Sequence, residues 1–227
     1  MNKKIINAII VSLILVSAVL FNIFRHDIVL YQALILKAIP TLGMALIVLV
    51  SKPDKSNIFI AFGFVFSMLG DIFMEMPGEE YFLLGIATNT LGIVMYVLQF
   101  YRNENKIDWV RLIPVSIVMF VFYIILYDYL AGLKIHVMIY CLIHTIFIWR
   151  SSARLGKAEF SEKSQWICFI GSVSVTISDF LLSLTIFGII KNQPKYEAID
   201  MILWWSGLFM IMIATKIDKK VKMSIVK

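Results

Sequence analysis

The chain is poor in charged residues and in cysteine. Only 16% of its 227 residues are Asp, Glu, Lys or Arg, against about 25% in a typical soluble domain, so an ordinary soluble domain is excluded. The two cysteines, Cys141 and Cys168, both lie in apolar surroundings, and no CxxC or HExxH spacing occurs. We therefore expect no disulfide framework, no metal site and no cofactor.

Long apolar runs are what the sequence has instead, and 60% of its residues are hydrophobic. A helix needs about 20 apolar residues to cross a bilayer, and it satisfies its own backbone hydrogen bonds in lipid. We predict an all-α, polytopic membrane helical bundle that forms a single integral membrane domain over residues 1–227. The eight predicted transmembrane helices are 5–24, 28–50, 57–76, 81–101, 109–130, 133–149, 166–190 and 199–217.

The net charge of +6 is distributed unevenly over the connections. With the N-terminus placed in the cytoplasm, sixteen Lys and Arg fall on the inner side and four on the outer side, and Lys37 within a span completes the 21. This asymmetry predicts cytoplasmic termini, a plasma membrane or bacterial inner membrane location, and a basic C-terminal tail that binds anionic membrane lipids rather than nucleic acid. The inner group is Lys3, Lys4, Lys52, Lys55, Arg102, Lys106, Arg111, Arg150, Arg154, Lys157, Lys163, Lys216, Lys219, Lys220, Lys222 and Lys227; the outer group is Arg25, Lys134, Lys191 and Lys195.

A few polar side chains interrupt the apolar runs. An ionised side chain at the bilayer centre costs roughly 2.5–3.5 kcal/mol on insertion scales, so such residues mark candidate functional sites. Counting residues along the predicted spans places five of the polar side chains at one depth, between the midplane and the outer leaflet. These five are Lys37, Asp71, Asn89, Asp179 and Ser206.

Two of the predicted helices share a pattern of small residues and an acid. When 57–76 is aligned with 166–190 at a shift of 108 residues, Gly63 meets Gly171 and Asp71 meets Asp179. Small residues let helices approach closely in membranes. The alignment indicates a parallel repeat of four spans plus four.

Several of these residues have more than one interpretation. Asp71 and Asp179 are either functional acids or hydrogen-bonded structural ones, and one of them could form a buried ion pair with Lys37. Glu75 lies near the outer boundary, where a solvated rim and a functional role are equally plausible. His144 falls nearer the inner side, away from the other polar residues, and we expect a packed core histidine.

Two carboxyl groups that face a shared pocket do not ionise equally. One then donates a proton while the other stays anionic, which is how glycosidases cleave acetals. Because such a pocket opens among lipid tails, we expect an amphiphilic lipid as substrate. Asp71 and Asp179 are the predicted catalytic residues, and the predicted substrate-binding residues are Lys37, Glu75, Asn89, Tyr96, Tyr140, Trp205 and Ser206.

A family resemblance follows from motifs spread in order along the chain. They are Lys37-Ala-Ile-Pro40, Gly70-Asp71, Gly85 with Tyr96, Ser178-Asp179-Phe-Leu-Leu and Trp204-Trp205-Ser206-Gly-Leu-Phe. Together they resemble the YhhN family of eight-span membrane proteins, which includes lysoplasmalogenases. The resemblance implies hydrolysis of the vinyl-ether bond of lysoplasmalogens to a fatty aldehyde and a glycerophospho-alcohol. The chain departs from the family pattern in having no histidine near Asn89 or Ile93.

Two other classes of function fit the same residues. A small-molecule or proton-coupled transporter also places acids near the midplane and uses an internal repeat, but usually has broken helices at its site. A lipid-binding protein that has lost catalysis is the second alternative. Proton-coupled flux, aldehyde release and intact bound lipid distinguish the three.

Overall fold

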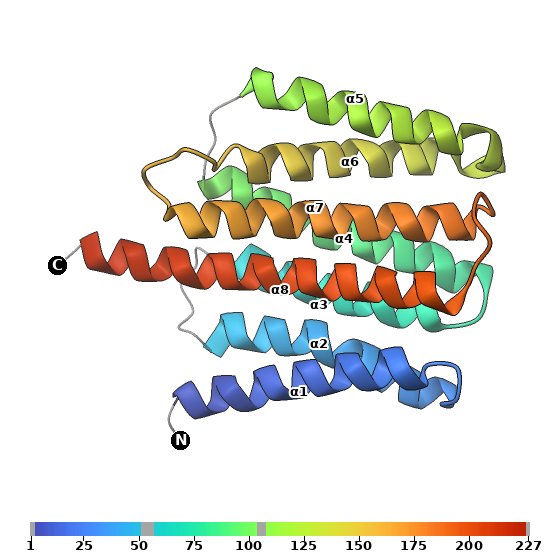
Figure 1. Ribbon diagram of the computed structural model, residues 1–227, viewed down its shortest axis with the longest axis horizontal. Coiled ribbons are helices and arrows are strands. Elements are labelled where there is room, and N and C mark those ends of the chain that lie inside the picture. Colours follow the sequence, from blue (N-terminus) through green and yellow to red (C-terminus); the bar gives the residue numbers. More distant parts are fainter. Residues whose placement is uncertain (1–2, 51–56, 104–107, 226–227) are drawn as a thin grey trace. The chain divides into compact units, whose positions relative to one another are not determined.

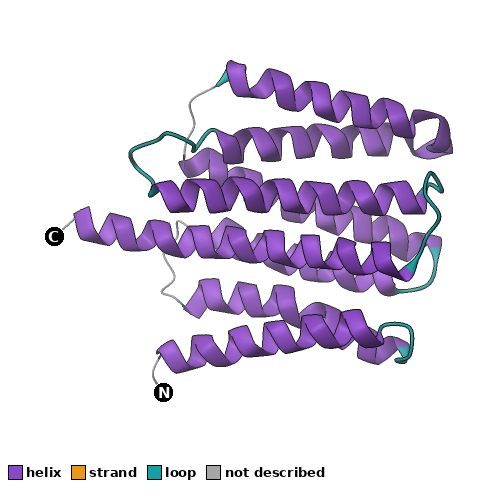
Figure 2. Cartoon of the chain, in the orientation of Figure 1, coloured by secondary structure: helices purple, strands orange, loops and turns teal. Residues whose placement is uncertain are grey.

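The computed structural model describes residues 3–50, 57–103 and 108–225, and in these ranges it contains helices but no strands (Figures 1 and 2). Eight of the helices are long and apolar enough to cross a membrane, which confirms the predicted fold class. They are α1 (Lys3–Phe24), α2 (Leu30–Val50), α3 (Ile58–Glu75), α4 (Glu79–Asn103), α5 (Trp109–Leu126), α6 (Lys134–Ser152), α7 (Glu162–Ile186) and α8 (Pro194–Ile225), with two short 3-10 turns, η2 (Tyr127–Tyr129) and η3 (Ala131–Leu133), between α5 and α6.

The predicted boundaries differ most from the structure at α7 and α8. The hydroxyl of Ser161 caps the backbone N–H of Ser164 at 3.2 Å, so α7 begins before its apolar run does. It ends four residues earlier than predicted, at Ile186, and Gly188 then takes a φ of +73° that few other residues adopt. Pro194 opens α8, where its missing N–H is tolerated.

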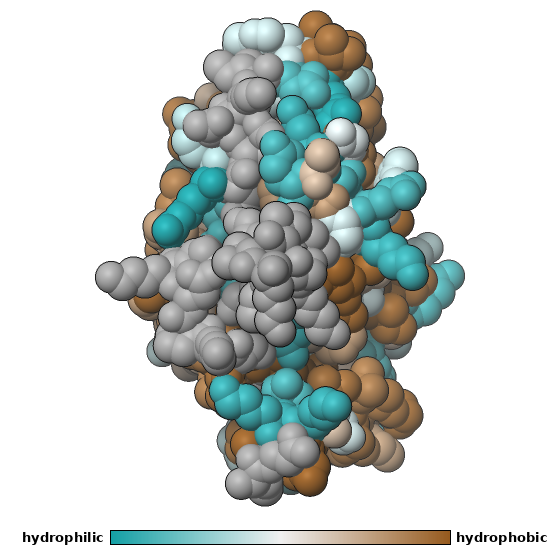
Figure 3. All heavy atoms as spheres, turned by 90° about the vertical axis from the view of Figure 1, so that its left-hand side faces the viewer, coloured by the Kyte–Doolittle hydropathy of each residue, from teal (hydrophilic) through white to brown (hydrophobic). Residues whose placement is uncertain are grey.

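Hydrophilic side chains gather at the helix ends that face the viewer in Figure 3, while apolar side chains occupy the flanks. On α5, Ile113, Ile117 and Phe120 are each more than half exposed, as expected for a helix that faces lipid. Membrane orientation remains a prediction. Lys52, Lys55, Lys106 and Lys227, which contribute to the charge asymmetry, lie outside the described residues.

The chain forms two compact units, Met1–Gln99 and Phe100–Lys227, with the division near the end of α4. In the first unit α2 packs against both α1 and α3. In the second, α6 packs against α5 and α7, and α7 packs along α8 (Figure 1). Each unit thus contributes four of the membrane helices, as the predicted four-plus-four repeat requires.

Glycine contacts repeat between the units. A Cβ added at Gly92 of α4 would lie 3.1 Å from the carbonyl oxygen of Gly63 on α3. A Cβ added at Gly207 of α8 would lie 2.7 Å from the carbonyl oxygen of Gly171 on α7. Gly63 and Gly171 are the residues that the shift of 108 aligns. The same backbone-to-backbone approach therefore joins α3 to α4 and α7 to α8, which supports the repeat.

Pro40 lies inside α2 without breaking it. Proline has no N–H, so the carbonyl oxygen of Leu36, four residues earlier, lacks its helical donor. The hydroxyl of Ser17 on α1 donates to this oxygen at 2.6 Å. Ser17 is itself buried. Helix α1 therefore supplies a hydrogen bond that lipid could not supply.

Ser17→Ala should destabilise the protein by about 1–3 kcal/mol, because it leaves the Leu36 carbonyl oxygen buried without a donor. Reversible unfolding in detergent measures the change. In a Pro40→Ala background the restored N–H takes over the carbonyl oxygen, so the same Ser17 substitution should cost less there. An equal cost in both backgrounds would contradict the pairing.

Candidate functional site

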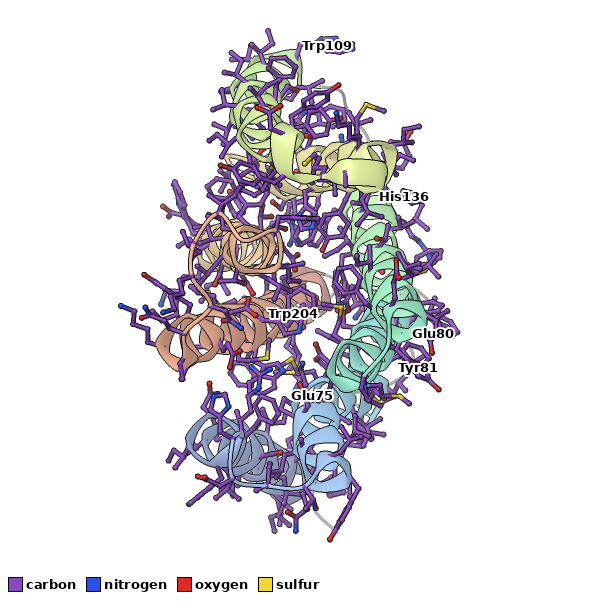
Figure 4. All side chains as sticks on the ribbon, turned by 90° about the vertical axis from the view of Figure 1, so that its right-hand side faces the viewer. Glu75, Glu80, Tyr81, Trp109, His136 and Trp204 are labelled. Carbon is purple, nitrogen blue, oxygen red and sulfur yellow. The ribbon has the colours of Figure 1, made fainter. Side chains whose placement is uncertain are left out.

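A charged cluster lies at one end of the first unit, where α1, α2 and α3 meet. The ammonium of Lys37 on α2 donates to the carboxylate of Glu75 on α3 at 2.9 Å, and the guanidinium of Arg25 lies 3.8 Å from the same carboxylate. Lys37 and Arg25 also lie over the ring of Phe21, at 5.7 Å and 5.6 Å from its centroid. Figure 4 labels Glu75 at the end of α3.

This cluster contains two of the predicted binding residues. Glu75 is only 13% exposed and carries an ion pair, so it is not a solvated rim residue. Lys37 pairs with Glu75, one turn of α3 beyond Asp71, so the structure gives this lysine a partner that the sequence left open. The two predicted binding residues are in direct contact.

The seam between α3 and α4 brings three more predicted residues together. Asp71 is 3% exposed. A Cβ added at the preceding Gly70 would lie 1.9 Å from the side-chain oxygen of Asn89, so Asn89 packs directly on the backbone beside Asp71. The hydroxyl of Tyr96 pairs with that of Ser67 at 3.1 Å, and Tyr96 lies close enough to Asp71 for an electrostatic interaction.

Asn89 is nine-tenths buried, and its side-chain oxygen has no hydrogen-bond partner among the described residues. A buried acceptor of this kind is costly unless a donor completes it. The donor can be a water molecule or a hydroxyl of a bound ligand. Gly70 makes the position possible, since any side chain there would collide with the Asn89 amide.

Asp179 in the second unit has a histidine partner. His144 on α6 is fully buried, and its Nε2 lies 3.1 Å from Oδ2 of Asp179 on α7. Its Nδ1 lies 3.0 Å from the hydroxyl of Thr176. We expected a packed core histidine away from the polar residues; it is packed, but that separation is wrong. Residues 144 and 179 lie on neighbouring helices of opposite direction, so counting along each span with uncertain boundaries missed their common depth.

Tyr140 and Asp200 complete the surroundings of this pair. The ring of Tyr140 lies 4.6 Å from that of His144, and its hydroxyl donates to the Asp179 carboxylate. Asp200 is buried, and the hydroxyl of Ser178 donates both to its carboxylate and to its backbone carbonyl oxygen. Tyr140 was predicted; Asp200 was not, because it stands second in the predicted span and resembles a solvated end residue.

The remaining predicted residues lie on α8. Trp205 and its neighbour Trp204, labelled in Figure 4, are both buried. The hydroxyl of Ser206 donates to the carbonyl oxygen of Leu203 in its own helix at 3.3 Å. This bond is the local pattern that serine forms within helices, and it gives Ser206 no partner on another element.

Arg150 and Arg154, which we predict to lie on the cytoplasmic side, are almost fully buried. Arg154 stacks on Phe160, with its guanidinium carbon 4.3 Å from the ring centroid, and donates to the hydroxyl of Ser164 at 3.3 Å. Arg150 lies over Tyr101 at 5.1 Å. The aromatic residues near both arginines were visible in the sequence, but their folding onto the guanidinium groups was not.

The described residues contain no group of three or more His, Cys, Asp or Glu side chains that could hold a metal ion. What they contain is buried carboxyl groups inside membrane-spanning helices. Fold and site thus define a multi-pass α-helical membrane protein with ionisable side chains in its spans. The model of the YhhN family matches residues 32–215, most of the chain, so the protein belongs to the YhhN family. No curated protein and no solved structure matches it.

Glu75→Leu should destabilise the protein by about 3 kcal/mol, since it leaves the buried Lys37 ammonium without its carboxylate. The double variant Lys37→Met with Glu75→Leu removes both charges and should recover most of this loss. Unfolding in detergent measures both. Additive losses would show that the two side chains are not energetically coupled.

Proposed function

We propose that the protein is a membrane hydrolase that cleaves the vinyl-ether bond of lysoplasmalogens or related lysophospholipid-like amphiphiles. Asp71 and Asp179 are the two carboxyl groups of the reaction. No cofactor takes part. The observation that supports the proposal is that the two acids aligned by the shift of 108 residues are both buried, one in each unit of a YhhN-family membrane protein.

Vinyl-ether hydrolysis needs an acid and a stabilising anion. A proton adds to the vinyl carbon that is not bonded to the ether oxygen, which leaves an oxocarbenium ion at the carbon next to that oxygen. Water attacks this cation, and the resulting hemiacetal collapses to a fatty aldehyde and a glycerophospho-alcohol. One carboxyl group donates the proton, while the other, ionised, stabilises the cation and orients the water, as in glycosidases.

The first unit offers groups suited to the polar part of a lysolipid. The side-chain oxygen of Asn89 lacks a donor among the described residues, and a lysolipid carries a free glycerol hydroxyl that can donate to it. Lys37 and Arg25 flank the single carboxylate of Glu75, so these three groups together carry one positive charge. That charge favours an anionic phosphate.

The helices count against the transporter alternative. Transporters usually bind their substrate at discontinuous helices near the midplane. Here α3 and α7, which carry the aspartates, are continuous over Ile58–Glu75 and Glu162–Ile186, and α2 stays helical through Pro40. Only a measurement of aldehyde release distinguishes the hydrolase from an inactive lipid-binding protein.

Asp71→Asn and Asp179→Asn should each reduce aldehyde release by 100-fold or more, on the order of what loss of general acid–base catalysis costs. Purified protein is incubated with lysoplasmalogen and the aldehyde is trapped and quantified, with an ester lysophospholipid as control substrate. Asp128→Asn, at an exposed residue of η2, is the matched control. Wild-type protein that binds the lipid and leaves it intact would disprove hydrolysis, and full activity in either aspartate variant would disprove its role.

Lys37→Met should raise KM for lysoplasmalogen several-fold and change kcat little, because the ammonium contacts the headgroup and not the reacting bond. Steady-state kinetics in mixed micelles separates the two constants. A variant with an unchanged KM would remove Lys37 from the binding site.

A further inference from the structure

We propose that the side-chain oxygen of Asn89 binds the free glycerol hydroxyl of the lysolipid, and that this contact selects lipids with one hydrocarbon chain over lipids with two. The inference deepens the proposed function and rests on it for the class of substrate. Every residue that it uses belongs to the first unit, Met1–Gln99. Asn89 thereby receives a defined group of the substrate and a defined consequence for specificity.

Asn89 lies on α4 where that helix packs against Gly70 of α3. Its side chain is nine-tenths buried, and its oxygen, Oδ1, has no hydrogen-bond partner among the described residues. A Cβ added at Gly70 would lie 1.9 Å from Oδ1, so this oxygen faces the C–H groups of Gly70, which are weak donors. A buried amide oxygen without an N–H or O–H donor destabilises the protein. A ligand that brings such a donor recovers the cost.

Lipids with one and with two chains differ at the middle carbon of the glycerol. In a lysolipid this carbon carries a hydroxyl group, which can donate a hydrogen bond. In a lipid with two chains the same oxygen is esterified and has no proton. Oδ1 of Asn89 can only accept, so it distinguishes the two classes. A bound lipid with two chains would leave this buried acceptor unpaired.

The spacing of groups along α3 suits a glycerophosphate. Gly70, which contacts Asn89, precedes Glu75 by five residues, or about 7.5 Å along the helix axis. At Glu75 lie the positive charges of Lys37, at 2.9 Å, and of Arg25, at 3.8 Å. The phosphate and the middle hydroxyl of a lysolipid are only a few covalent bonds apart, and each hydrogen bond adds about 3 Å. One molecule can therefore contact the charged cluster and Asn89 together.

Binding of the hydroxyl at Asn89 also positions the reacting group. The vinyl ether is attached to the glycerol carbon next to the one that carries the hydroxyl. Asp71 is the residue after Gly70 and is buried. A substrate whose hydroxyl is bound at Asn89 therefore has its vinyl ether near this acid, which is the kind of positioning that accelerates a reaction.

The test measures the binding of three lysolipid analogues with a saturated ether bond, which the protein cannot hydrolyse. The first has the free hydroxyl, the second has hydrogen in its place, and the third has a methoxy group, which like an ester oxygen lacks a proton. Wild-type protein in detergent should bind the first about tenfold more tightly than the other two, as expected for one hydrogen bond to a buried acceptor. Displacement of a fluorescent lysolipid gives the three dissociation constants.

Two variants of Asn89 and one control identify the residue responsible. Asn89→Leu removes the acceptor at similar volume and should bind all three analogues equally, whereas Asn89→Asp retains an acceptor and should retain the preference. Asn7→Leu is the matched control, because the side-chain oxygen of Asn7 also has no partner among the described residues. Asn7 lies about 21 Å along α1 from Phe21, the residue beneath Lys37, so Asn7→Leu should keep the wild-type preference.

Wild-type protein that binds the three analogues equally overturns the inference without any variant, and water is then the donor that Asn89 has. A preference that persists in folded Asn89→Leu overturns it as well. Because the analogues are not hydrolysed, neither result depends on turnover. Wild-type protein that prefers the free hydroxyl but releases no aldehyde from lysoplasmalogen overturns the proposed function instead, and the assignment of Asn89 as a lysolipid-binding residue stands.

Discussion

The interior of a bilayer offers no hydrogen-bond partners, so polar groups in these helices depend on partners within the protein. This constraint explains the contacts that recur across both units. The carbonyl oxygen freed by Pro40 is met by Ser17, the ammonium of Lys37 by Glu75, and Asp179 by His144. Helices that were apolar throughout would need none of these pairs. Each pair marks a place where a membrane-spanning helix carries a polar group and a neighbouring helix supplies its partner.

Close helix approach is the second requirement, and glycine supplies it in the same way twice. Gly63 with Gly92, and Gly171 with Gly207, bring backbone against backbone. The two halves then diverge in what they add to the shared framework. The first half adds the ion pair of Lys37 and Glu75 and the side-chain oxygen of Asn89, which has no hydrogen-bond donor among the described residues. The second half adds the buried imidazole of His144. The two halves therefore share a pattern of glycine contacts and differ in the polar side chains that surround it.

The sequence was sufficient for the eight helices, because apolar run length alone decides whether a segment can span a bilayer. It was also sufficient to single out Asp71, Asp179 and Lys37, because an ionisable residue is conspicuous among apolar ones. It could not pair them. The partner of Asp179 depends on how α6 rotates against α7, and a single histidine on an apolar face gives no sign of that rotation. Asp200 was not predicted for a related reason, because acidic residues near the end of a membrane span are usually solvated.

The first helix, α1, contributes contacts that its apolar composition does not suggest. It lies entirely before residues 32–215, the part of the chain that the family model matches. Yet it provides the hydroxyl that completes the proline-containing helix and the aromatic ring beneath Lys37. A version of this protein trimmed to the recognisable family core would lose both. Helix α1 is therefore part of the folded protein, and comparisons among relatives have to include it.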